Sequence, residues 1–337
     1  MIRKCGALKV AVIGAGFMGK IHARILSELK ECELMAISDV DFEMAKEIGE
    51  QYGIRAYKDY KDMLDCENLD AVFVATPTKT HADVAVDVMN AGMHCFVEKP
   101  IADTIENAER IRDATKKAGV KLMVGHVERF NPVVLELKKR LESNELGKIW
   151  EAHIMRRGPF PERIRDVGVV IDLATHDLDI MSFLLNSDVS RVYGEISQNI
   201  HTSREDLMNA LLRFENGVIG NLNVNWLTPA KIRDIIIIGE RGMFKANYIT
   251  QDLEFYKSYS LAGKSGDYSD FLMGAIESNI QKIAVKKEEP LKIELRAFLD
   301  CISNNREPPV SAGDGIKVLK LAESIIVSGK TGSVVRF

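Results

Sequence analysis

The feature that most constrains the fold is a run of glycines directly after the first apolar segment. Lys9–Ile13 is apolar and β-branched, and Gly14-Ala15-Gly16-Phe17-Met18-Gly19 follows at once, ahead of a helical pattern. Gly14 permits a tight turn, Gly16 lets the backbone approach a ligand, and Gly19 allows helix and strand to pack closely. This order predicts a parallel α/β unit that binds phosphate groups at a helix N-terminus.

An acidic residue follows at the end of the next apolar run. Asp39 lies about twenty residues beyond Gly19, where a carboxylate can accept hydrogen bonds from both hydroxyls of an adenine ribose. A 2′-phosphate would be repelled there, Asp41 adds a second negative charge, and no arginine follows directly. Although glycine-rich turns also occur at strands that bind nothing, this context favours a dinucleotide site, with NAD preferred over NADP.

Length and composition indicate a soluble protein of two domains. The chain has 337 residues, of which 46% are hydrophobic and 28% charged, and no segment approaches a membrane span or a secretory signal. A net charge of −4 disfavours nucleic acid as the main partner. Five scattered cysteines without a Cys-x-x-Cys pair argue against a disulfide framework and predict reduced, buried thiols in a cytoplasmic protein.

Up to about Gly125, short apolar runs alternate with amphipathic helical segments. The runs with strand character are Lys9–Ile13, Leu34–Ser38, Ala71–Ala75, His94–Val97 and Lys121–Val124. The helical segments between them include Glu43–Gln51, Ala82–Ala91 and Ile105–Ala118. Strands that alternate with helices form a parallel sheet covered on both faces. Residues 1–128 are therefore expected to form a doubly wound, Rossmann-type α/β domain.

The pattern changes after a linking helix at Pro132–Leu141. The later strand-like segments are Lys148–Met155, Arg191–Ser197, Ala210–Phe214, Val218–Asn225, Ile232–Ile238 and Met243–Asn247. Their connections, such as Glu215-Asn216-Gly217, are too short for helical crossovers, so neighbouring strands must be antiparallel. Two helices, about Leu291–Ile302 and Gly313–Ser328, close the chain. Residues 129–337 are expected to form an α+β domain with a large, mostly antiparallel sheet.

One candidate for chemistry is the triplet Glu98-Lys99-Pro100, at the carboxyl end of the strand His94–Val97. Ligands of open α/β sheets bind at this edge, and Pro100 biases the backbone of Lys99 away from helix. A lysine held there could reach the nicotinamide end of a dinucleotide and a substrate oxygen. The alternative is a surface charge at a strand end.

A second candidate is the pair Asp172 and His176, inside an apolar helical segment. Residues four apart share a helical face, and a carboxylate beside an imidazole fixes its tautomer, as a general base requires. The alternative is a capping or solvated cluster. Zinc binding by Asp172, His176 and Asp179 is a weaker interpretation, because no His-x-x-x-His motif or cysteine pair accompanies them. No metal is therefore expected. The sequence contains no Gly-x-Ser-x-Gly motif, which would have indicated a hydrolase.

Taken together, these motifs resemble the Gfo/Idh/MocA oxidoreductase family over nearly the whole chain. The matching motifs are Gly14–Gly19, Ala75-Thr76-Pro77 followed by His81, Glu98-Lys99-Pro100, Arg129-Phe130-Asn131-Pro132, and Asp172 with His176. The resemblance implies that Lys99, Asp172 and His176 are the catalytic residues. It also implies a dinucleotide site lined by Gly14, Gly16, Phe17, Met18, Gly19, Asp39, Thr76, Pro77, His81, Glu98 and Lys99.

The activity implied by this resemblance is hydride transfer between NAD and a carbon that bears a hydroxyl, usually on a sugar or cyclitol. His176 would take the hydroxyl proton, Asp172 would orient the imidazole, and Lys99 would bond the same oxygen. Family analogy also implies a homo-oligomer, a dimer or tetramer, that uses the outer face of the second sheet. Some proteins of this fold bind dinucleotide or sugar as regulators without turnover, but the intact trio favours an enzyme.

The substrate expectation rests on arginines near the Asp172–His176 segment. Residues 156–168 carry four of them, and arginine forks bind phosphate oxygens well. This stretch resembles that of UDP-N-acetylglucosamine 3-dehydrogenases, which belong to the family and oxidise the sugar 3-hydroxyl. The expected substrate contacts are Arg129, Arg157, Arg163 and Arg165. The alternatives are surface ion pairs for the arginines and myo-inositol or a free sugar as substrate.

Overall fold

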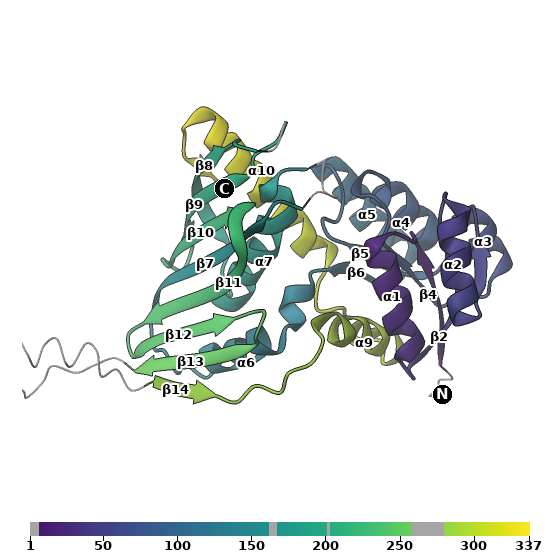
Figure 1. Ribbon diagram of the computed structural model, residues 1–337, viewed down its shortest axis with the longest axis horizontal. Helices are drawn as coiled ribbons and strands as arrows, with labels where there is room; N and C mark the ends of the chain where they lie inside the picture. The colour runs from purple at the N-terminus through teal and green to yellow at the C-terminus, as the bar shows by residue number, and fades with distance from the viewer. Residues whose placement is uncertain (1–6, 162–166, 201–202, 258–279) are drawn as a thin grey trace, which may run out of the picture. The chain divides into compact units, whose positions relative to one another are not determined.

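The computed structural model describes residues 7–161, 167–200, 203–257 and 280–337. The chain forms two compact units, one of Met1–Val127 with Leu291–Lys320 and the other of Glu128–Pro290 with Leu321–Phe337 (Figure 1). The first unit therefore also contains a late segment of the chain. The expected division into 1–128 and 129–337 assigns that segment to the second domain.

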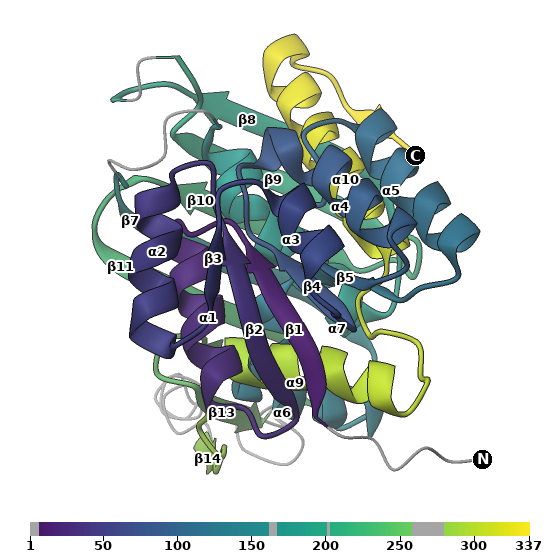
Figure 2. The ribbon, with the colours of Figure 1, turned by 90° about the vertical axis from the view of Figure 1, so that its right-hand side faces the viewer.

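The first unit is built on a parallel sheet, as expected from the sequence. Its described strands are β1 (Leu8–Ile13), β2 (Cys32–Ser38), β3 (Arg55–Tyr57), β4 (Ala71–Val74), β5 (His94–Glu98) and β6 (Leu122–Gly125). They pair in the order β3-β2-β1-β4-β5-β6, and neighbouring strands lie side by side in Figure 2. The strand order reverses between β1 and β4, which is where ligands bind in doubly wound folds. The three-residue strand β3 is not evident from the sequence.

Helices cover this sheet on both faces. They are α1 (Phe17–Glu28), α2 (Phe42–Tyr52), α3 (Tyr60–Cys66), α4 (His81–Asn90), α5 (Ile105–Ala118) and α9 (Pro290–Ser303), with a short 3₁₀ turn at Thr78–Thr80. Phe298 of α9 packs on Phe73 and Phe96 of the sheet, with ring centroids 5.7 and 5.9 Å apart. This apolar contact draws residues 291–320 back to the first unit, because α9 must bury its apolar face.

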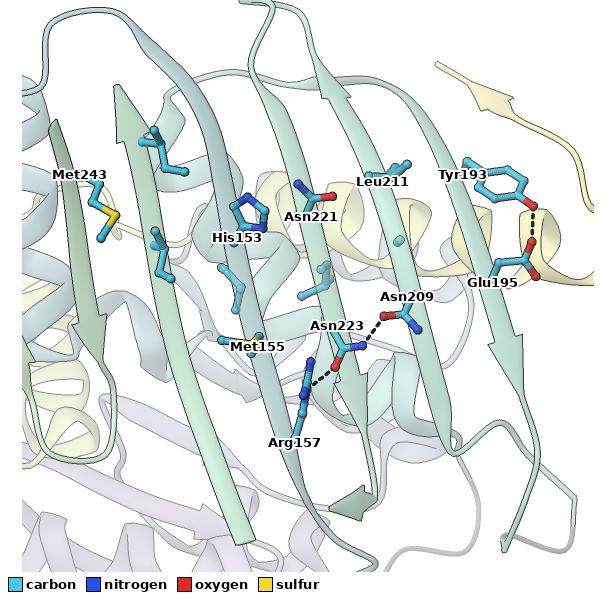
Figure 3. Close-up of a pocket in the computed structure, with 15 residues that line it drawn as sticks. His153, Met155, Arg157, Tyr193, Glu195, Asn209, Leu211, Asn221, Asn223 and Met243 are labelled. Carbon is cyan, nitrogen blue, oxygen red and sulfur yellow. Dashed lines mark hydrogen bonds between the residues drawn. The ribbon is translucent and has the colours of Figure 1, made fainter. Parts of the chain in front are cut away.

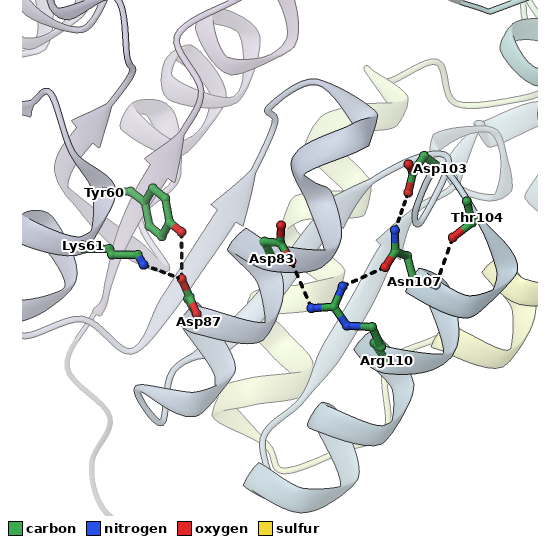
Figure 4. Close-up of polar contacts among 8 residues, drawn as sticks. All are labelled: Tyr60, Lys61, Asp83, Asp87, Asp103, Thr104, Asn107 and Arg110. Atoms are coloured by element: carbon green, nitrogen blue, oxygen red, sulfur yellow. Dashed lines mark hydrogen bonds and ion pairs between the residues drawn. The ribbon is translucent and has the colours of Figure 1, made fainter.

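Polar side chains join the surface helices of this unit (Figure 4). The Tyr60 hydroxyl donates to Asp87 at 2.8 Å, which links α3 to α4, and Arg110 of α5 donates to Asp83 of α4 at 3.0 Å. Burial and then this hydrogen bond raise the pKa of Tyr60. The Thr104 hydroxyl accepts from the Asn107 amide at 3.1 Å and caps α5.

The second unit carries a larger sheet of mixed direction, which confirms the expected fold class. Its described strands are β7 (Ile149–Pro159), β8 (Val189–Ser197), β9 (Leu207–Phe214), β10 (Ile219–Asn225), β11 (Leu227–Gly239), β12 (Gly242–Asn247), β13 (Asp252–Lys257), β14 (Ile280–Ile283) and β15 (Val335–Arg336). They pair in the order β14-β13-β12-β11-β7-β10-β9-β8-β15. Among the described strands only β7 and β10 pair in parallel, and the other pairs are antiparallel.

Within the described part of the chain, helices cover one face of this sheet and leave the other open. The covering helices are α6 (Pro132–Glu142), α7 (Thr175–Leu185) and α10 (Ala312–Thr331). The four consecutive isoleucines of β11 divide between the faces, since side chains alternate along a strand. Ile235 and Ile237 are 1% exposed in the core, whereas Ile236 and Ile238 line a hollow of about 530 Å³ on the open face.

Two further properties bear on the sequence predictions. No helix within the described residues is long and apolar enough to cross a membrane. Cys32, Cys95 and Cys301 are buried, and burial raises the pKa of Cys32 to about 12. Cys66 is exposed, which corrects the expectation of buried thiols, because it ends the short surface helix α3. Cys5 lies outside the described residues.

Candidate functional site

The glycine turn has the geometry that its three glycines predict. Gly14 has φ +101°, and a Cβ there would lie 2.6 Å from the carbonyl oxygen of Ala75. A Cβ on Gly19 would lie 1.8 Å from the carbonyl oxygen of Gly14. A Cβ on Gly16, in contrast, would meet nothing within 4 Å. The protein itself therefore requires glycine at 14 and 19, while the open space at Gly16 is free for a ligand.

The start of α1 is suited to a phosphate group. Gly16 is its N-cap and no side chain caps the helix, whereas Asp59 and Asn131 cap α3 and α6. The first backbone N–H groups of a helix need acceptors, and a pyrophosphate supplies them. Phe17 is 62% exposed beside them and Met18 is partly exposed, so apolar side chains are available to a bound ligand.

Asp39 lies against the glycine turn. Its Oδ2 accepts a hydrogen bond from the Ala15 amide at 2.6 Å, and its Oδ1 accepts one from the Asp41 amide at 2.9 Å. Two carboxylate oxygens offer about four acceptor positions, so capacity remains for ribose hydroxyls. Val40 and Asp41 are exposed and no basic residue directly follows Asp39. This environment favours NAD over a cofactor with a 2′-phosphate.

Replacing Asp39 with Asn should reverse part of this preference. The variant keeps one acceptor oxygen but removes the charge that repels a 2′-phosphate, so the ratio of the NADPH to NADH dissociation constants should fall about tenfold or more. Titration of cofactor fluorescence measures both constants. Asp41→Asn, which removes the same charge two residues away, is the control. An unchanged ratio in Asp39→Asn would contradict the placement of Asp39 at the ribose.

The end of β4 lies beside the same turn. Ala75 contacts Gly14, and Thr76 and Pro77 follow it into the short 3₁₀ turn. The Thr80 hydroxyl donates to the Thr76 hydroxyl at 2.9 Å and approaches the Pro77 carbonyl oxygen at 2.8 Å. Thr76 and Pro77 are thus held at the carboxyl edge of the sheet, where the sequence placed them.

His81, which the resemblance places in the dinucleotide site, contacts the backbone through its ring. Its Nδ1 lies 2.9 Å from the carbonyl oxygen of Pro100 and its Nε2 lies 2.9 Å from that of Thr76. Both ring nitrogens therefore face the backbone, and the side chain supports the turn beyond β5. Burial lowers the pKa of His81, with a partial offset from the two carbonyl contacts.

Glu98 and Lys99 continue directly from β5. The buried Glu98 carboxylate lies 2.7 Å from Nε2 of His22 and accepts a hydrogen bond from the Lys99 amide at 3.2 Å. Lys99 is partly exposed, and its peptide bond to Pro100 is cis. Glu98 is thus buried, while Lys99 is partly exposed at the sheet edge.

Asp172 and His176 lie in the second unit, at the start of α7. The sequence predicts one α-helix for both, but Val170–Ala174 forms a π-helical turn and the α-helix begins at Thr175. An i→i+5 turn is wider, so Asp172 precedes the regular helix yet stays within one turn of His176. Both residues are partly exposed, whereas Thr175, Asp177 and Asp179 are buried.

The two buried aspartates of α7 each form an ion pair with an arginine. Asp179 accepts two hydrogen bonds from Arg129, from Nη2 at 2.6 Å and Nε at 2.8 Å. Asp177 accepts from Nε of Arg156 at 2.7 Å, and Nη1 of Arg156 donates to Glu128 at 2.9 Å. Asp179 is therefore held in a buried ion pair with Arg129. Asp172 and His176, in contrast to these two aspartates, are partly exposed.

Two of the four arginines expected to contact the substrate, Arg129 and Arg157, lie within the described residues. Arg129 is only 9% exposed and its guanidinium is bound to Asp179, so it supports the start of α6 and α7. Arg157 follows Arg156 on β7 and therefore points to the opposite face of the sheet. There its Nε donates to Asn223 at 2.5 Å, on the open face shown in Figure 3. Arg163 and Arg165 lie outside the described residues.

One cation on the helix-covered face was not singled out from the sequence. Arg233 of β11 is paired with Arg156 of β7, so it shares the face of the Arg156 side chain. Its Nη1 is buried without a hydrogen-bond partner among the described residues. Burial and then the charge of Arg156 lower the pKa of Arg233, against the opposing charges of Asp177, Glu128 and Asp172. The sequence could have indicated this placement. Arg233 stands two residues before the apolar Ile235, and residues two apart on a strand face the same side of the sheet.

The ion pair of Arg129 and Asp179 gives a direct test of its structural role. Arg129→Met should destabilise the protein by about 3–5 kcal/mol, because it leaves a buried carboxylate without its partner. Arg129→Met with Asp179→Leu should recover part of that loss. Urea unfolding followed by circular dichroism measures both. A change in substrate KM without loss of stability would instead make Arg129 a substrate contact.

Comparisons with known proteins identify the family. A model described as an oxidoreductase family with an NAD-binding Rossmann fold matches residues 8–126, and one described as the GFO/IDH/MocA C-terminal domain matches residues 134–245. A myo-inositol 2-dehydrogenase of Thermotoga maritima is 28% identical over 326 residues, which cover 93% of this chain and 94% of that protein.

A second relative is known from both its sequence and a solved structure. A UDP-N-acetylglucosamine 3-dehydrogenase of Acidithiobacillus ferrooxidans is 26% identical over 321 residues, which cover 95% of this chain and 97% of that protein. Its structure matches with a TM-score of 0.83 at 25% identity and covers 96% of this chain and 97% of the other. The resemblance seen in the motifs is thereby confirmed. The chain belongs to the Gfo/Idh/MocA oxidoreductase family, and its first unit is an NAD-binding Rossmann domain.

Proposed function

We propose that this protein is an NAD-dependent dehydrogenase that acts on a secondary hydroxyl of a sugar-type substrate. The observation that carries the proposal is a difference in burial among the acidic residues in and directly before α7. Asp177 and Asp179 are buried in ion pairs with arginines, which leaves Asp172 and His176 partly exposed. An accessible carboxylate and imidazole four residues apart can perform proton transfer.

The roles of the residues follow from their chemistry. His176 accepts the proton of the substrate hydroxyl, and Asp172 stabilises the imidazolium that forms. Lys99 can donate a hydrogen bond to a substrate oxygen as negative charge develops on it. NAD, when bound, accepts the hydride that leaves the substrate carbon. The atoms balance, since the alcohol loses one hydride and one proton and becomes a ketone.

The residues that would hold NAD lie at one edge of the first sheet. The N–H groups at the start of α1 and the open backbone at Gly16 suit the pyrophosphate, and Asp39 suits the adenine ribose. Thr76, Pro77 and Lys99 follow the strand ends nearer the nicotinamide side of such a ligand. His81 and Glu98 support that edge through backbone and side-chain contacts.

The first substrate to consider is a UDP-N-acetyl-hexosamine, oxidised at its 3-hydroxyl. Support comes from the relative of Acidithiobacillus ferrooxidans, a UDP-N-acetylglucosamine 3-dehydrogenase that covers nearly the whole chain. Arg163 and Arg165 are the arginines of the 156–168 segment that stay candidates for a diphosphate contact.

The second candidate is myo-inositol or a free sugar. The specific observation in its favour is that the two described arginines among the expected substrate contacts have partners within the protein, Arg129 in Asp179 and Arg157 in Asn223. The relative of Thermotoga maritima, a myo-inositol 2-dehydrogenase, points the same way.

One assay separates these candidates. The purified protein is incubated with NAD and, in turn, UDP-N-acetylglucosamine, UDP-glucose, myo-inositol and free hexoses, with a ketone trap, while NADH absorbance is followed. Turnover confined to a UDP-sugar supports the first candidate, and an Arg163→Ala variant should then raise its KM. Turnover confined to inositol or hexoses supports the second. Binding of NAD without any turnover would favour a regulator that binds dinucleotide or sugar.

A further inference from the structure

Two buried histidines lie on either side of the turn that carries Lys99. His22 belongs to α1 and is fully buried, and His81 begins α4 and is 1% exposed. Neither belongs to β5, which leads into the lysine. The side chain of one contacts the residue before Lys99, and the side chain of the other contacts the residue after it.

His22 acts on the Glu98 carboxylate. Its Nε2 lies 2.7 Å from Oε1 of Glu98, and its ring packs edge-on against Phe96 with centroids 5.4 Å apart. Burial alone would raise the pKa of the Glu98 carboxyl, but the hydrogen bond from His22 and nearby positive charge hold it below its ordinary value. An ionised carboxylate only accepts hydrogen bonds, so Nε2 of His22 is the donor.

The other oxygen of Glu98 is fixed as well. Oε2 accepts the hydrogen bond from the Lys99 amide at 3.2 Å. It also lies against the neighbouring strand β6, where a Cβ on Gly125 would come within 3.0 Å of it. The carboxylate thus occupies a narrow slot, and its orientation sets the direction of the Lys99 N–H.

His81 acts on the other side of the lysine. Nδ1 and Nε2 each lie 2.9 Å from a carbonyl oxygen, of Pro100 and Thr76 respectively. Burial lowers the pKa of this ring, so it is neutral near pH 7 and donates through one nitrogen at a time. The imidazole therefore lies between the ends of β4 and β5 and donates to only one of the two carbonyl oxygens at a time.

We propose that His22 and His81 are positioning residues that hold the backbone of Lys99 in place, His22 through the Glu98 carboxylate and His81 through the Pro100 carbonyl. The inference rests on the proposed function, because that function gives Lys99 its role. A lysine side chain has a flexible four-carbon stem, so its placement depends on how firmly its backbone is anchored. A displacement of about 1 Å at such a group can cost about 10²-fold in rate.

Hydrogen exchange of the Lys99 amide tests this directly and needs no substrate. Pro100 has no amide hydrogen, so the Lys99 N–H is the reporter of the turn. In His22→Leu and His81→Leu its exchange should become about tenfold faster, while the amides of Cys95 and Phe96 in β5 keep their rates. His22→Gln and His81→Asn, which retain a donor, should stay near wild type. His94→Gln, at the other end of β5, is the matched control.

The outcomes separate this proposal from the proposed function. Unchanged Lys99 exchange in both leucine variants overturns it, whether or not the protein turns over a sugar. If UDP-N-acetylglucosamine or myo-inositol reacts, kcat should fall by about 10- to 10²-fold in the leucine variants, with the NADH dissociation constant changed less than about threefold. Faster exchange with an unchanged kcat also overturns it. Absence of wild-type turnover contradicts the proposed function alone, and the exchange result still decides whether the histidines hold the turn.

Discussion

A Gly19→Ala variant is expected to lose NADH binding and to unfold far more readily than the wild type. The added Cβ would lie 1.8 Å from the carbonyl oxygen of Gly14, which is backbone and cannot swing aside. Moving that turn would cost at least about 3 kcal/mol of stability. It would also displace the start of α1, whose amides are proposed to bind the pyrophosphate. Thermal unfolding and NADH fluorescence titration measure the two effects.

Gly16→Ala is the matched variant, because it adds the same methyl group where nothing lies within 4 Å and φ is an ordinary −69°. Its stability should stay within about 0.5 kcal/mol of wild type. Its NADH dissociation constant should still rise by about 10- to 10²-fold, since the methyl occupies the space that a pyrophosphate would approach. Wild-type NADH affinity in Gly16→Ala would show that the cofactor does not pass over this residue.

The second large effect is expected at His176. His176→Gln should lower kcat/KM by about 10²- to 10⁴-fold, the usual contribution of a positioned general base. The NADH dissociation constant should hardly change, because the residues proposed to hold the cofactor belong to the first unit. Steady-state rates with the substrate found in the sugar panel, together with NADH titration, measure these two quantities.

A histidine on the open face of the same sheet provides the control. His153 is 38% exposed on β7 and lies 2.9 Å from Glu151, and the His153→Gln change should leave rates within about twofold of wild type. Equal losses in both variants would mean that His176 acts through stability. Full activity of His176→Gln would remove it from the mechanism and return the pair with Asp172 to a structural role.

Secondary structure was predictable where local pattern and packing agree. Ile105–Ala118 is the helix that the sequence predicts, because a capping Thr104 and a left-handed Gly119 mark its ends. The three-residue strand β3, the strand β13 and the edge strands β14 and β15 were not predicted. Short or edge strands gain their stability from pairing with distant residues, and little of that is visible in local periodicity.

The sequence by itself determined the dinucleotide edge, because Gly14, Gly16, Gly19 and Asp39 act through local backbone geometry that depends on the residues themselves. Tertiary structure alone decided which charged groups remain available. Arg129, expected as a substrate contact, is paired with the buried Asp179 of α7, and Arg157, expected as another, donates to Asn223 on the open face. A charge in a sequence has no fixed partner, since partners come from residues brought together only by folding. The same holds for His22 and His81, whose contacts with Glu98 and Pro100 span 76 and 19 residues.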